Sequence, residues 1–222
     1  ISTILIKTAF SNSDQDNSEA FEQFRANRLV VARRLAAERG LDPSNVDADG
    51  YPIGFGKDNQ AVLLPAFLSA YSGTDAGDVS FSAFKDIPLP NWDIKYTGLM
   101  RLDWFKKNFK RFSIAHGYQA YQTINQFQTN LDYDSGLDQG GNFKNRVLYS
   151  NINLTELFSP LVKIDLEMQN SIKVLAEIRK DRSLSLSFDN NLLTEMSGNQ
   201  YTLGLGYRIK DVKIGTRIEG RR

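Results

Sequence analysis

The sequence of 222 residues lacks cysteine and has only one histidine, His116. Without cysteine the chain can form no disulfide, no thiolate metal site and no cysteine nucleophile. A single histidine cannot build a histidine-rich metal site or a triad with an alternate histidine base. These two shortages remove several kinds of metal site and nucleophilic site at once.

Long apolar runs and an excess of one charge are also missing. No apolar run of about 18 residues occurs, so we expect no transmembrane helix. The sequence also has no basic segment followed by a short apolar stretch, so we expect no signal peptide. The 27 Lys and Arg residues are balanced by 26 Asp and Glu, and both signs are spread along the chain. We therefore expect no nucleic-acid partner.

The sequence opens with ISTILIKTAF, which has strand character and no initiating methionine. We expect residues 1–10 to be a strand and the chain to be a fragment of a larger polypeptide. Residues 11–90 then read as an insertion that begins with a polar loop at 11–18. Helical spacing predicts a helix at about 18–39, ended by Gly40 and Pro43. A second, short helix at 61–71 is expected to break at Pro65.

Apolar and charged side chains alternate along LVKIDLEM, residues 161–168. Such a period of two predicts a strand with two different faces, Ile164, Leu166 and Met168 on one and Lys163, Asp165 and Glu167 on the other. A soluble sandwich would bury the apolar face against a second sheet. An outer-membrane barrel would turn the apolar face towards lipid and keep the charged face inside.

Residues 91–222 are predicted to be almost entirely strands. We expect strands over 92–102, 111–133 and 146–168, the last interrupted near Phe158, with DWFKKNFK as a short connection. At about 3.3 Å per residue, a strand of some 22 residues would reach roughly 70 Å. Sandwich modules use strands of about five or six residues. Strand length therefore favours a barrel.

The last strands carry two further signals. Residues 171–190 form either one long strand or a hairpin that turns at RKDR, and we favour the single strand. In QYTLGLGYRI the tyrosines lie near both ends of one face, as in the aromatic girdles of barrels. That face carries Tyr201, Leu203, Leu205, Tyr207 and Ile209, and the opposite face carries Thr202, Gly204, Gly206 and Arg208.

An open sheet of six strands has two unpaired edges, and each unpaired backbone group in hydrocarbon costs several kcal/mol. The missing strands must then come from the rest of the polypeptide or from partners. The sequence therefore predicts an all-β fold, a fragment of a very large transmembrane β-barrel with one helical insertion.

Two loop motifs resemble known ligand sites. NVDADG at 45–50 starts like a calcium loop, but the twelfth position is Gly56 where a bidentate glutamate is required, so a simple turn is preferred. GFGKDN lacks the spacing and the hydroxyl of a phosphate-binding loop.

The remaining candidates are single residues or pairs. His116 reads as a hydrogen-bonded wall residue and not as a catalytic base. Asp132 and Asp134 could share one face of a strand, but solvation explains them better, and IEGR at 218–221 reads as native sequence. We assign no catalytic, cofactor-binding or metal residue, and expect no enzyme and no cofactor.

Several segments together resemble the C-terminal part of the SprA/Sov family, the giant outer-membrane translocon of the type IX secretion system of Bacteroidota. The segments lie in family order and span nearly the whole chain: GYPIGFGKDNQAVLLPAFLSAYSG, IPLPNWDIKYTGL, FKRFSIAHGY, SLSLSFDNNLLTE and YTLGLGYRIKDV. Family members are much longer and enclose a wide protein-conducting pore, so this chain would be a small share of one.

The resemblance implies a segment of the pore wall of a protein-conducting translocon in the bacterial outer membrane, serving secretion and gliding motility. It implies as partners the rest of the barrel, a PorV-like small barrel, a plug protein, accessory lipoproteins, secreted cargo and membrane lipid. The alternatives are another outer-membrane transporter and a soluble β-sandwich adhesin or carbohydrate-binding module. With short turns in the periplasm, the insertion at 11–90 would be extracellular, over the pore mouth or against a partner.

Overall fold

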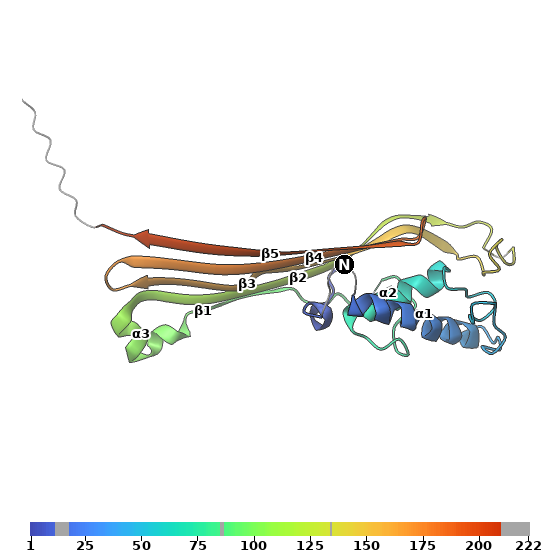
Figure 1. Cartoon of the computed structure of the whole chain (residues 1–222), viewed down its shortest axis with the longest axis horizontal. Helices are drawn as coiled ribbons and strands as arrows, with labels where there is room; N and C mark the ends of the chain where they lie inside the picture. The colour runs from blue at the N-terminus through green and yellow to red at the C-terminus, as the bar shows by residue number, and fades with distance from the viewer. Residues whose placement is uncertain (12–17, 85–86, 134, 210–222) are drawn as a thin grey trace, which may run out of the picture. The chain divides into compact units, whose positions relative to one another are not determined.

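The computed structural model describes residues 1–11, 18–84, 87–133 and 135–209. The described chain is mostly β, with a five-stranded antiparallel sheet in the order β1-β2-β3-β4-β5 (Figure 1). The strands are β1 (Trp92–Tyr96), β2 (Phe109–Thr129), β3 (Val147–Met168), β4 (Ile172–Ser187) and β5 (Leu192–Tyr207). The α-helices are α1 (Glu19–Glu38), α2 (Gln60–Ser72) and α3 (Asp103–Asn108). Among the described residues, no helix is both long enough and apolar enough to span a membrane.

The long strands agree with the alternation in the sequence. β4 is a single strand from Ile172 to Ser187, so the hairpin alternative at RKDR is wrong. β3 continues through Phe158 and the cis Ser159–Pro160 bond, so the predicted interruption is also wrong. This strand pairs with β2 on one side and β4 on the other, and two neighbours hold the backbone extended across the proline.

Two predicted strands are absent or shorter than expected. Residues 1–10 contain only an isolated bridge from Ser2 to Tyr121 and a 3₁₀ helix, Ile6–Thr8. The strand prediction for 1–10 is wrong because side chains of the sheet bind the backbone near Leu5 and Thr8, where a neighbouring strand would otherwise pair. The strand predicted over 92–102 ends at Tyr96, because Gly98–Arg101 closes into a second 3₁₀ helix.

The helices also refine the prediction. α1 confirms the expected helix at about 18–39, and its N-cap is Ser18, whose hydroxyl accepts from the N–H of Phe21 at 3.3 Å. α2 runs through Pro65 without a break, because most of the helix is buried and its packing outweighs the lost hydrogen bond. The connection DWFKKNFK contains a helix, α3, before β2 begins.

The chain divides into two compact units, which are described separately. Unit 1 comprises 1–92, 118–157 and 181–198, and unit 2 comprises 93–117, 158–180 and the described residues from 199 onward. In unit 1, α1 and α2 pack against each other, with the rings of Phe24 and Phe67 6.2 Å apart. Unit 2 contains β1 from Asp93 onward, α3 and one part of each longer strand.

Candidate functional site

The strands of unit 2 expose an apolar face that no described part of the chain covers. Leu203 and Leu205 of β5 are 74% and 76% exposed, and Ile94 of β1 is 55% exposed. The same kind of exposure extends to Tyr96, Val162, Ile172, Ile178, Tyr201 and Tyr207. Thr202 and Gly206 of the opposite face are exposed as well, so exposure alone does not tell which face of β5 is outward, while Gly204 faces the Leu175 side chain of β4.

The opposite face of unit 2 carries charged side chains that pair across the strands. Arg111 of β2 contacts Asp165 of β3 at 2.8 Å, and Lys163 of β3 contacts Glu177 of β4 at 3.1 Å. Glu177 also pairs with Arg179, and Lys173 lies 4.0 Å from Glu167. Because residues two apart on one strand share a face, the charged side chains of β3 and β4 lie opposite the apolar side chains of the same strands, such as Val162 and Ile178.

Aromatic rings gather around α3 at the start of β2. Trp104 and Phe105 have ring centroids 5.0 Å apart, and Phe105 and Phe112 are also 5.0 Å apart. Phe109 lies between them, 5.8 Å from Trp104 and 5.6 Å from Phe112. Trp104 is nevertheless 64% exposed, so the cluster presents an indole at the surface.

In unit 1 one face of the sheet is covered instead of exposed. The buried side chains are even-numbered residues of three neighbouring strands: Tyr118, Ala120, Gln122, Ile152, Leu154, Glu156, Arg182, Leu184 and Leu186. The N-terminal segment lies over part of this face, with Leu5 only 1% exposed. Phe21 and Leu63 of the two helices line the same hollow as Leu186.

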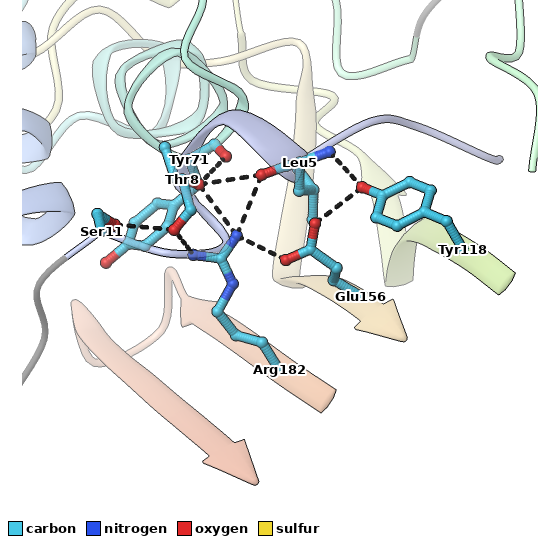
Figure 2. A network of polar contacts seen from close by, with 7 residues as sticks. All are labelled: Leu5, Thr8, Ser11, Tyr71, Tyr118, Glu156 and Arg182. Carbon is cyan, nitrogen blue, oxygen red and sulfur yellow. Dashed lines mark hydrogen bonds and ion pairs between the residues drawn. The ribbon is translucent and has the colours of Figure 1, made fainter. Parts of the chain in front are cut away.

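A buried polar network, which we call the clamp, ties the N-terminal segment to three strands of unit 1 (Figure 2). Arg182 of β4 lies 3.0 Å from Glu156 of β3 and donates to the Thr8 carbonyl at 2.8 Å and the Thr8 hydroxyl at 2.9 Å. Tyr118 of β2 donates to Glu156 at 2.8 Å and accepts from the N–H of Leu5 at 2.7 Å. The charged pair is almost fully buried, with side-chain exposures of 5% and 1%.

The clamp reaches α2 through Thr8. The Thr8 hydroxyl donates to the carbonyl of Tyr71 at 2.7 Å (Figure 2). Burial raises the pKa of the Tyr71 phenol above its usual range; the negative charge of Glu195 adds to this shift and Arg182 opposes it. The phenol therefore stays neutral at ordinary pH, and the buried pair of Arg182 and Glu156 is not joined by a third charge.

A second attachment in unit 1 joins the insertion to the loop between β2 and β3. The N–H of Gly56 donates to Asn142 at 2.7 Å, and the N–H of Phe143 donates to the carbonyl of Gly54 at 2.9 Å. Asn59 donates to the Phe143 carbonyl at 3.2 Å. GYPIGFGKDN is therefore a docking segment, and its glycines allow backbone and ring to approach closely.

Substituting Gly54 with alanine should release this loop. Gly54 has a φ of +90°, and an added Cβ would overlap the ring of Phe143. Strain and overlap together should cost about 2 kcal/mol or more. Gly50 is the matched control, because its φ is +81° and nothing lies within 4 Å of an added Cβ. We expect thermolysin to cut near Leu137 much faster in G54A than in G50A, and equal rates would contradict the docking role.

The structure places the other sequence candidates in ordinary structural roles. In NVDADG, Asp47 accepts from the N–H groups of Asp49 and Tyr51, each at 2.9 Å, and Asp49 pairs with Lys57 at 3.0 Å, which is a turn as predicted. The His116 ring is hydrogen-bonded to the Leu161 carbonyl at 2.8 Å. Within the described ranges, no cluster of three or more His, Asp or Glu side chains is placed to hold a metal ion.

Two sequence candidates cannot be placed as predicted. Asp132 lies in a turn after β2 and not on a strand, while Asp134 lies outside the described residues. IEGR at 218–221 also lies outside them. Sequence reasoning missed the clamp entirely, because its members are far apart in the chain and their contacts depend on strand register.

Comparison with known proteins leaves the family undecided: no protein-family model matches the chain, and none of the curated proteins compared with it is a match.

Proposed function

We propose that this chain is part of the wall of a protein-conducting barrel in the bacterial outer membrane. The observation that carries the proposal is the pair of faces in unit 2, one apolar and exposed and one lined by cross-strand ion pairs. A soluble sheet that exposes so many large apolar side chains would aggregate. In a bilayer the same face meets hydrocarbon, and the charged face meets water in the pore.

Strand length in unit 2 supports a bilayer. Unit 2 contains nine residues of β2 (109–117), eleven of β3 (158–168), nine of β4 (172–180) and nine of β5 (199–207). A tilted strand crosses a bilayer in about 9–11 residues. The remaining residues of the long strands belong to unit 1, where one face is covered by protein, as suits a part that stands outside the hydrocarbon.

The unpaired edges of the sheet require neighbours. β1 and β5 are the end strands, and in hydrocarbon their free backbone groups would each cost several kcal/mol. Further strands from the same polypeptide would satisfy them and close the barrel. We assign unit 1, with its helical insertion, to the extracellular side, and we propose a PorV-like barrel, a plug protein and accessory lipoproteins as partners.

Conduction of protein is proposed from the resemblance of the family-like segments to the SprA/Sov translocon. The charged face suits a water-filled path for polypeptides, because its acids are neutralised by neighbouring bases. Arg179 pairs with the same glutamate as Lys163. Such a surface offers no strong charge of one sign to trap cargo.

Photo-crosslinkers at neighbouring positions of β3 test whether one face meets lipid and whether the other face meets secreted protein. Residues 163 and 164 face opposite sides of the strand, so a crosslinker at Ile164 should capture lipid and one at Lys163 should capture secreted protein. Lipid at Ile164 without protein at Lys163 would favour a transporter for small molecules. Capture of this chain alone at both positions would favour a soluble sandwich and refute the membrane wall.

A further inference from the structure

The end of unit 2 at α3 combines aromatic and basic side chains. The rings are those of Trp104, Phe105, Phe109 and Phe112, all within about 6 Å of a neighbouring ring. The basic side chains are Arg101, Lys106, Lys107 and Lys110, all exposed. We call these eight residues the basic-aromatic turn.

The basic-aromatic turn is held in a fixed conformation by the turn between β3 and β4. The Gln169 side chain donates to the carbonyls of Lys106 and Phe109, at 3.0 and 3.1 Å, and its backbone N–H donates to the Asn108 carbonyl at 3.0 Å. Lys110 donates to the hydroxyl of Ser171 at 2.9 Å. A rigid turn loses little conformational freedom on binding.

Positive charge is in excess on this turn. Lys106 is paired with Asp103 at 3.4 Å, whereas the partner of Lys110 is a neutral hydroxyl. In the part of the chain that the structure describes, Lys107 makes no ion pair or side-chain hydrogen bond. Lysine charges without a counter-charge beside the exposed indole of Trp104 favour an anionic partner that also has an apolar portion.

We propose that the basic-aromatic turn binds the phosphate groups of anionic glycerophospholipids at the membrane surface. The indole ring favours the boundary between headgroups and acyl chains, and lysine side chains extend from there to the headgroups. The phosphate supplies the counter-charge that Lys107 and Lys110 lack, and the rings of Trp104 and Phe105 supply the apolar contact. This inference rests on the proposed membrane wall and adds a lipid specificity to it.

Binding to vesicles of two compositions tests the proposal. The 222-residue chain, diluted from detergent, is mixed with vesicles of phosphatidylcholine alone or with an equal amount of phosphatidylglycerol. A Trp92→Phe background leaves Trp104 as the reporter, since the sequence has two tryptophans. We expect a blue shift of its emission and a partition onto anionic vesicles that weakens with salt. Removing one lysine charge should weaken that partition about fivefold, from about 1 kcal/mol per basic residue.

Lys107→Gln is the test variant, and Lys144→Gln in the loop before β3 is the control with the same change of charge. We expect a loss on anionic vesicles for K107Q alone, and none on phosphatidylcholine. A fluorescent label on a cysteine at Leu203 reports the wall independently. If that label enters lipid while K107Q and K144Q bind anionic vesicles equally well, the proposed lipid specificity is wrong and the proposed membrane wall is supported. If neither reporter enters lipid, both proposals fail.

Discussion

Glu156→Gln should destabilise unit 1 by about 3 kcal/mol, because the substitution leaves the guanidinium of Arg182 buried without a counter-charge. The pair is 3.0 Å apart, and the two side chains are 5% and 1% exposed. Glutamine keeps an acceptor for Tyr118, so the loss reports the charge and not the hydrogen bond. Arg182 still donates hydrogen bonds to Thr8 in this variant. The expected loss of stability is therefore at the lower end of the range of about 3–5 kcal/mol for breaking a buried ion pair.

Urea unfolding followed by the fluorescence of Trp92 measures this loss. Trp92 stacks on Tyr118 with ring centroids 4.5 Å apart, so its emission responds to the clamp. A Trp104→Phe background removes the other tryptophan. We expect the double variant E156Q/R182M to lose much less than the sum of the two single variants, because no unpaired charge remains.

Asp49→Asn is the control for the clamp prediction. Asp49 and Lys57 form an ion pair at 3.0 Å in the same unit, with side chains that are 56% and 46% exposed, so removing the Asp49 charge should change the free energy of unfolding far less than E156Q does. If E156Q were as mild as D49N, or if the double variant were simply additive, the clamp would not be the coupled buried pair that the distances indicate.

Regular patterns in the sequence predicted the elements that depend on local periodicity. The alternation of residues 161–168 belongs to β3, and the helical spacing after Ser18 belongs to α1. The strand predicted for the opening residues is wrong because their apolar side chains do pack, as buried Leu5 shows, but beside a 3₁₀ helix and not on a strand. Hydrophobic pattern reports burial more reliably than it reports backbone conformation.

Arg182 shows why long-range contacts could not be predicted. In the sequence it interrupts an apolar row and resembles a turn residue, yet it is buried against Glu156 on the neighbouring strand. The register that brings these residues together is set by whole strands. Pro65 is a similar case, because only the buried packing of α2 explains why the helix continues through it.

The proposed wall also fixes which ends of the strands lie outside the cell. Barrels of bacterial outer membranes have short periplasmic turns and long external loops. The turn between β3 and β4 spans only residues 169–171, whereas the loop between β2 and β3 spans 130–146. We therefore expect Asn170 to face the periplasm, and Leu131, together with the insertion around Thr74, to face the exterior.

Single cysteines test this topology in intact cells, because the chain has no native cysteine. A maleimide on a polymer too bulky to cross the pore should label cysteines placed at Leu131, which is 92% exposed, and at Thr74. A cysteine at Asn170 should stay unlabelled until the outer membrane is broken, and then react as fast as the others, which controls for local accessibility. Labelling of Asn170 but not of Leu131 or Thr74 in intact cells would reverse the orientation. The helical insertion would then lie in the periplasm, where it could not meet a partner at the cell surface.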